Sequence, residues 1–105
     1  MIKVLLGFKV KKGADIQPIL LKLRSYSLSF PNFVSAEYLR SEQDDSIVSI
    51  SYNWERIEDY REWESSTMIK QILKEAKELT VDEPKVTIYT TIAPSSGWDK
   101  YPNIP

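Results

Sequence analysis

Four segments of β-forming residues and two helical segments follow one another in the order β-α-β-β-α-β along this 105-residue chain. The strand segments carry apolar residues at every second position, whereas the helical segments carry them at every third or fourth position. The length suits one domain with a single hydrophobic core. These three observations predict an α+β domain built on one antiparallel sheet.

The first strand is expected over residues 2–10, and the first helix follows it. One face of the strand is fully apolar and comprises Ile2, Val4, Leu6, Phe8 and Val10. Residues 11–15 break the alternation, and from Ile16 the apolar residues recur at helical spacing, with Asp15 as the predicted N-cap. Pro31 should end the helix, because proline disfavours the α conformation in the residue before it.

A β-hairpin is predicted from residues 33–40 and 46–54, joined by the short acidic connector SEQDD. In the second of these strands one face is apolar and the other is mostly small and polar. In the first strand, Glu37 and Tyr38 must point to opposite faces. We expect Tyr38 to face the interior, because an unpaired carboxylate is costly to bury.

The second half of the chain predicts a short helix over residues 55–63, a longer amphipathic helix over 68–79 and a last strand over 85–93. The segment SST at 65–67 separates the two helices and caps the second. The complete order is ferredoxin-like, a βαββαβ arrangement in which helices cover one face of a four-stranded antiparallel sheet.

The opposite face of the sheet would be bare, and it mixes lysine, serine and threonine with apolar residues. We expect this face to meet a second copy of the chain in a homodimer. The domain should span residues 1–94. The tail at 95–105 contains Trp98, Tyr101 and Ile104, which is unusual for a disordered end, so we expect it to pack on the domain or on the partner subunit.

Composition excludes several classes of function. A net charge of −1 makes nucleic acid an unsuitable partner, because binding phosphates requires a basic surface. The chain has no cysteine and no histidine, so it lacks thiolate sites, the commonest metal ligand and the commonest general base. No signal peptide is recognisable, and no apolar run is long enough for a membrane helix. We therefore expect a cytoplasmic protein that binds no metal, no cofactor and no membrane.

The segment SYNWERIEDYREWESS at 51–66 contains two of the three tryptophans. Trp54 shares the apolar strand face with Val48, Ile50 and Tyr52, so we expect it to pack in the core. Trp63 lies beside the break between two helices, where a pocket between sheet and helices would open. Its position is compatible with a core residue and with the wall of a ligand site.

This arrangement resembles the antibiotic biosynthesis monooxygenase family: a strand ending in Trp54, a charged linker, a helix carrying Trp63, then two serines and an apolar helix. The segments PNFVSAEYLR (31–40) and KVTIYTTIAP (85–94) are similar to the second and last strands of that family, which often has glycine where this chain has Asn32. The resemblance covers about residues 2–94. It implies a dimeric α+β barrel.

One branch of the family degrades haem, using an asparagine on the first strand, a tryptophan on the helix and a histidine about ten residues further on. Trp63 matches the tryptophan. The asparagine position falls on or beside Gly7 and the histidine position falls on Leu73. Because leucine cannot bind iron and glycine has no side chain to hold oxygen, haem degradation of that kind is excluded.

Another branch oxidises polycyclic phenols with O₂ and without a cofactor. The resemblance to this branch implies a site that stacks an aromatic substrate and stabilises its anion with hydrogen-bond donors. Trp63, Tyr60 and Tyr52 are the predicted ligand-binding residues, and the candidate catalytic residues are Trp63, Tyr38, Arg40 and Asn53. Packing roles for the two tyrosines and a surface role for Arg40 are the structural alternatives.

Three hypotheses on function follow. The chain is a cofactor-independent monooxygenase that acts on a small hydrophobic aromatic substrate, or a non-catalytic protein that binds a small apolar ligand, or a dimeric structural protein whose pocket is filled by its own side chains.

Overall fold

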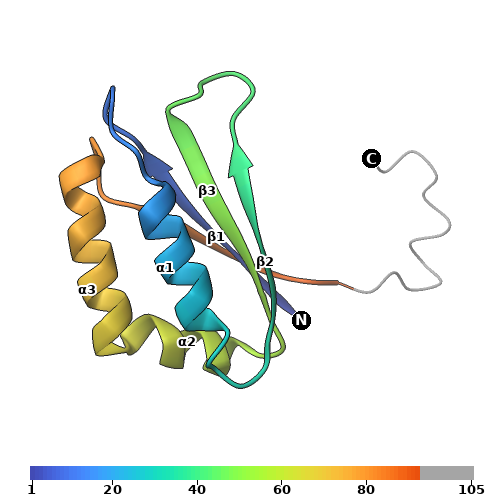
Figure 1. Ribbon diagram of the computed structural model, residues 1–105. Coiled ribbons are helices and arrows are strands. Elements are labelled where there is room, and N and C mark those ends of the chain that lie inside the picture. The colour runs from blue at the N-terminus through green and yellow to red at the C-terminus, as the bar shows by residue number, and fades with distance from the viewer. Residues whose placement is uncertain (93–105) are drawn as a thin grey trace, which may run out of the picture.

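The computed structural model describes residues 1–92, which form a four-stranded antiparallel sheet with all helices on one face (Figure 1). The elements in chain order are β1 (Ile2–Lys9), α1 (Gln17–Ser27), β2 (Phe33–Arg40), β3 (Ile47–Trp54), α2 (Ile57–Ser65), α3 (Thr67–Ala76), the 3₁₀ helix η1 (Lys77–Leu79) and β4 (Lys85–Thr90). This order confirms the predicted ferredoxin-like α+β fold. The predicted tail at 95–105, with its two aromatic residues, lies outside the described residues.

The strands lie in the order β2-β3-β1-β4, so β2 and β4 are the edges of the sheet. Ile50 pairs with Leu6 on one side and with Tyr38 on the other. Because paired residues of neighbouring strands share a face, Tyr38 lies on the helix side of the sheet, as the sequence predicts. The pairing of β2 with β3 shifts between Phe33 and Ser35 and is regular from there to Arg40.

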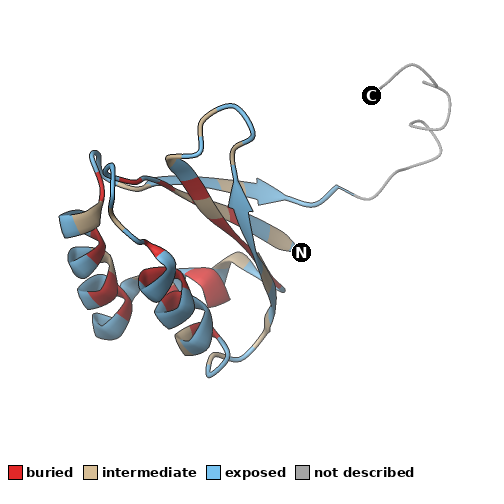
Figure 2. Cartoon of the chain, turned by 45° about the horizontal axis from the view of Figure 1, so that its top comes forward, coloured by how far each residue is buried: buried red, intermediate tan, exposed pale blue. Residues whose placement is uncertain are grey.

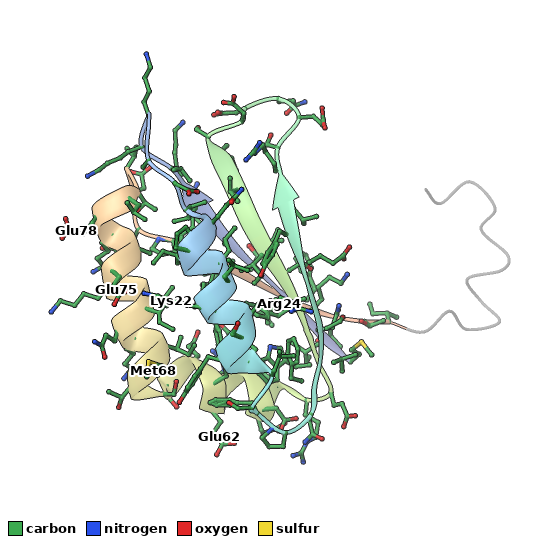
Figure 3. All side chains as sticks on the ribbon, in the orientation of Figure 1. Lys22, Arg24, Glu62, Met68, Glu75 and Glu78 are labelled. Atoms are coloured by element: carbon green, nitrogen blue, oxygen red, sulfur yellow. The ribbon has the colours of Figure 1, made fainter. Side chains whose placement is uncertain are left out.

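The core fills the space between the sheet and the helices, as the alternating burial along β1 and β3 indicates (Figure 2). Trp54 is fully buried there, which confirms its predicted packing role. The outer surfaces of α1 and α3 are largely exposed, and an ion pair joins them. Lys22 on α1 and Glu75 on α3 approach to 2.9 Å, side by side across the seam between the helices (Figure 3).

Helix ends differ from the predicted ones by up to three residues. α1 ends at Ser27, four residues before Pro31, so the prediction that Pro31 ends this helix was wrong, and α3 ends at Ala76, with the 3₁₀ helix η1 covering the rest of its predicted range. Ile16, not Asp15, occupies the N-cap position of α1, although the Asp15 carboxylate accepts a hydrogen bond from the Gln17 backbone N–H at 3.0 Å. The prediction of Asp15 as the N-cap residue was therefore wrong by one position. The capping role predicted for the SST segment is confirmed, because Ser66 is the N-cap of α3 and its hydroxyl accepts from the Ile69 N–H at 3.3 Å.

The other face of the sheet carries no helix within residues 1–92. It presents side chains such as Lys3, Leu5, Asn53, Thr87 and Tyr89. Gly7 also lies on this face, where an added Cβ would come within 3.3 Å of the Ser49 hydroxyl. None of the helices in the described part of the chain has the length and hydropathy needed to span a bilayer.

Candidate functional site

A groove of about 240 Å³ lies between α1 and the second half of β2, and we name it the α1–β2 groove. The polar residues that line the groove are Gln17, Tyr38 and Arg40. The apolar residues that line it are Ile16, Leu20, Leu21, Leu39 and Val48. At ~30 Å³ for each water molecule, its volume equals that of roughly eight waters. This is room for one or two aromatic rings.

The two-residue repeat of β2 and the helical repeat of α1 explain why these side chains meet in the groove. Tyr38 and Arg40 are two residues apart on β2, so both point to the helix side. Ile16 and Leu20 are one helical turn apart and stand over the sheet at this point. Because β2 is an edge strand, this end of the space between helix and sheet stays open to solvent.

Tyr38 and Arg40 are available to a ligand. The Tyr38 side chain is 43% exposed, and its hydroxyl donates a long hydrogen bond of 3.4 Å to the Leu20 carbonyl. Arg40 is exposed, and within residues 1–92 no carboxylate lies close enough to form an ion pair with it. A guanidinium and a phenol at the mouth of an apolar groove suit a ligand with one anionic oxygen.

A closed aromatic cluster occupies the core under α2. The Trp63 ring lies 4.9 Å from Tyr52, 6.1 Å from Trp54 and 5.8 Å from Tyr60, on which it stacks. Trp63 is only 1% exposed, and neighbouring aromatic rings surround it. It does not line the α1–β2 groove. A role of Trp63, Tyr60 and Tyr52 in ligand binding therefore stays a prediction, and it would require this cluster to open.

Most side-chain polar atoms in the aromatic cluster have no hydrogen-bond partner among the described residues. The Tyr52 hydroxyl and the indole N–H groups of Trp54 and Trp63 are buried and find no hydrogen-bond partner among residues 1–92. The Tyr60 hydroxyl donates to the Glu64 carboxylate at 2.7 Å. Burial raises the pKa of both tyrosines, and for Tyr60 the Glu64 carboxylate adds to the effect. Both hydroxyls are therefore neutral near pH 7 and can act as donors but not as bases.

A polar clamp joins the loop before β2 to the start of α2. The nearly buried Asp59 carboxylate accepts hydrogen bonds from the Asn32 side chain at 3.1 Å and from Arg56 at 3.3 Å. The Asn32 carbonyl accepts the Glu55 N–H at 3.0 Å. Asn32 has a φ of 65°, the left-handed conformation that asparagine tolerates and that glycine prefers. The hydrogen bonds from Arg56 and then from Asn32 lower the pKa of Asp59.

The residues predicted for the site thus divide into three places. Tyr38 and Arg40 lie together in the α1–β2 groove, and Tyr52, Tyr60 and Trp63 lie together in the aromatic cluster. Asn53 lies on the opposite face of the sheet, where its amide donates to the Ser35 hydroxyl at 2.9 Å. It cannot reach a ligand in the groove of its own subunit.

Sequence reasoning missed the α1 side of the groove. Ile16 and Leu20 belong to the apolar stripe of the predicted helix, and such a stripe indicates core packing rather than a ligand site. Leu21 lies off that stripe and is more than half exposed. Its exposure was no signal in itself, because single exposed apolar side chains are common on protein surfaces.

Comparison with known proteins gives one family and a set of similar folds. The family model described as antibiotic biosynthesis monooxygenase matches residues 1–75. SnoaB, a cofactor-independent oxygenase from Streptomyces nogalater, is similar in structure with a TM-score of 0.77 and 14% identity, over 90% of this chain and 96% of that chain. Rv0793 from Mycobacterium tuberculosis gives a TM-score of 0.78 at 13% identity, over 90% and 98%.

A conserved protein from Methanosarcina mazei gives a TM-score of 0.73 at 18% identity, over 84% of this chain and 89% of that chain. At such identities these likenesses establish the fold alone. None of the curated proteins is similar enough in sequence to count as a relative.

Proposed function

The chain belongs to the antibiotic biosynthesis monooxygenase family, and from this we propose that it is a cofactor-independent monooxygenase-like protein acting on a small hydrophobic aromatic substrate. The observation that supports this proposal is the α1–β2 groove, in which apolar walls lead to the side chains of Tyr38 and Arg40. SnoaB, a cofactor-independent oxygenase, has the same fold.

The proposed reaction uses a phenol that is oxidised as its anion. Arg40 and the Tyr38 hydroxyl would hold the phenolate oxygen, and the apolar walls would hold the ring. The phenolate passes one electron to O₂, and the phenoxyl radical and superoxide then combine by forming a C–O bond at a ring carbon. The ring hydrogen leaves as a proton, the O–O bond breaks, and water departs. Each phenol and O₂ therefore yields one quinone and one water.

The groove supplies no base for this reaction. No carboxylate is among the residues that line it, and the chain has no histidine and no cysteine. The substrate would therefore have to lose its proton to water. The protein would contribute by favouring the anion through the positive charge of Arg40.

Oxygen consumption with 1,5-dihydroxynaphthalene tests the proposal. We expect uptake above the uncatalysed rate, rising with pH toward the pKa of the phenol, and at least a roughly tenfold loss in Arg40→Gln. Arg61→Gln is the control, because it removes the same charge from α2 outside the groove. Oxygen uptake equal to the background, or equal in both variants, would contradict the proposal.

The alternative function is binding without turnover. The absence of a carboxylate, histidine or cysteine among the lining residues of the groove is the observation that favours it. Saturable binding of the same phenol, with no oxygen consumed, would distinguish this function from the first.

The proposed partner is a second copy of the chain, with the bare faces of the two sheets packed together, and the cytoplasm is the proposed location. Lys3 and Lys9 of the bare face lie near the two ends of β1, so the residues between them would form the contact with the other sheet.

A further inference from the structure

We infer that the natural ligand of the α1–β2 groove carries an anionic group, and that a basic hollow beside the groove binds this group. The inference rests on the proposed function only in using the same groove. It narrows the ligand from an apolar aromatic molecule to an amphiphilic one with a carboxylate, sulfate or phosphate at one end.

The basic hollow lies where the loop after β1 meets the end of the β2–β3 hairpin. Lys9, Lys11, Lys12 and Arg40 contribute to its walls, and Asp45 is the one acidic residue among the lining residues. Arg40 also lines the α1–β2 groove. The two depressions therefore share Arg40 as a lining residue, and the inferred ligand would extend from one into the other past this residue.

The charges of the hollow are poorly compensated. Lys9 pairs with Asp44 at 3.5 Å, but the Asp44 carboxylate also accepts hydrogen bonds from the backbone N–H and the hydroxyl of Ser46. Within residues 1–92, no carboxylate lies within ion-pair distance of Lys11, Lys12 or Arg40. This positive cluster stands on a chain whose net charge is −1. Although the adjoining connector SEQDD is acidic, only its Asp45 is among the residues that line the hollow, so basic residues outnumber acidic ones there.

Size and charge together define the ligand class. The groove has room for one or two rings, as its volume of about 240 Å³ indicates. An exposed lysine alone contributes little to binding, because water and salt screen it. Several cations around one anion contribute together, so Lys11 and Lys12 would hold the anionic end while Arg40 holds the phenolate oxygen. Hydroxynaphthoates and naphthyl phosphates have this combination of a small apolar body and an anionic end.

Calorimetric titration with matched probes tests the inference. The probes are 6-hydroxy-2-naphthoate, its neutral amide, 2-naphthyl phosphate and inorganic phosphate. The proteins are the wild type, the double variant Lys11→Gln/Lys12→Gln, and a control, Lys70→Gln/Lys74→Gln. The control removes the same charge from the exposed side of α3, at lysines that also have no ion-pair partner among the described residues.

We expect the naphthoate to bind about tenfold more tightly than its amide to the wild type and to the control at low salt. In Lys11→Gln/Lys12→Gln this advantage should fall to about twofold or less, while the amide binds as before. Naphthyl phosphate should behave like the naphthoate if charge alone matters, and a preference for one of them identifies the anionic group. Inorganic phosphate should compete only weakly, because it cannot use the groove.

Three results would overturn the inference: equal affinity of acid and amide, an advantage that survives the loss of Lys11 and Lys12, or competition by inorganic phosphate as strong as that of naphthyl phosphate. Tight binding of the acid without oxygen uptake would contradict the oxygenase proposal alone. Oxygen uptake with equal binding of acid and amide would contradict this inference alone. If neither the naphthoate nor its amide binds at a concentration of roughly 1 mM, both proposals fail.

Discussion

Asp59 shows how one carboxylate fixes two parts of the chain. It is almost fully buried, yet Asn32 and Arg56 both donate hydrogen bonds to it, so its charge is compensated. These bonds tie the turn before β2 to the first turn of α2. Because α2 carries Tyr60 and Trp63, the position of the aromatic cluster depends on this clamp.

In Asp59→Asn, the free energy of unfolding should change less with pH in the acid range than it does in the wild type. Since the folded-state pKa of Asp59 is lowered, its ionised form stabilises the fold above the usual value of 3.8, and this contribution disappears as the pH falls through the lower, folded value. Thermal unfolding from pH 7 to pH 2 should show the variant less stable at neutral pH and the difference shrinking below about pH 4.

Asp82→Asn is the control for this prediction, because Asp82 is exposed and forms no ion pair with the described residues. A difference between wild type and Asp59→Asn that stays constant down to pH 2 would show that the clamp does not depend on the charge of Asp59.

At the level of elements, the break between α2 and α3 is held by a cap. Ser66 is extended, with φ −67° and ψ 146°, and its hydroxyl satisfies the Ile69 N–H. The chain thereby changes direction and begins α3 with its apolar side toward the sheet.

Ser66→Ala should lower the free energy of unfolding by about 1 kcal/mol, because the N–H at the start of α3 loses its partner. Ser65→Ala is the matched control. The Ser65 hydroxyl donates only to the Glu62 carbonyl at the exposed end of α2, so we expect a change within about 0.5 kcal/mol. Urea unfolding of the three proteins measures both values. Equal losses in the two variants would refute the capping role.

The helices and strands were predictable because their apolar residues repeat with the periods of helix and strand. β2 agrees with its predicted range, and β1 and β3 do so within one residue. Helix ends were less predictable, since Asp15 has the chemistry of a cap but the chain places it one residue too early. The left-handed φ of Asn32 was not predicted, and neither was the hydrogen bond of its side chain to Asp59, which lies 27 residues away in the sequence.

The α1–β2 groove could be predicted only in part. Alternation along β2 placed Tyr38 and Arg40 on the helix side. No local pattern indicates that β2 is the edge strand or that α1 lies over it, because both depend on the pairing order of the whole sheet. For Asn53, alternation already put it on the small, polar face of its strand, so its inclusion with Tyr38 and Arg40 rested on residue type rather than on position.

Within residues 1–92, one face of the sheet is covered by helices and the other is bare. The bare face mixes polar and apolar residues and has Leu5 near its centre. Such a face suits a two-fold dimer, in which both subunits contribute the same residues to the interface. Leu5→Lys should convert the proposed dimer to a monomer, because it places two charges in the interface.

Sedimentation velocity, with circular dichroism to confirm folding, measures this effect. Leu28→Lys makes the same replacement at the exposed end of α1 and should leave the dimer intact. A wild-type protein that sediments as a monomer would contradict the proposed assembly.

We propose that a ligand binds in the α1–β2 groove and not in the aromatic cluster. Filling the groove with a large side chain distinguishes these two places. Leu21 lines the groove and is 57% exposed, so Leu21→Trp adds a large ring there without disturbing the core. Met68→Trp adds the same ring at the start of α3, away from the groove and similarly exposed (Figure 3).

Calorimetric titration of the three proteins with 2-naphthol is the measurement. The groove as the ligand site predicts saturable binding to the wild type and to Met68→Trp, and at least a roughly tenfold weaker affinity in Leu21→Trp. Equal affinity in all three proteins would contradict the claim and would place the ligand elsewhere.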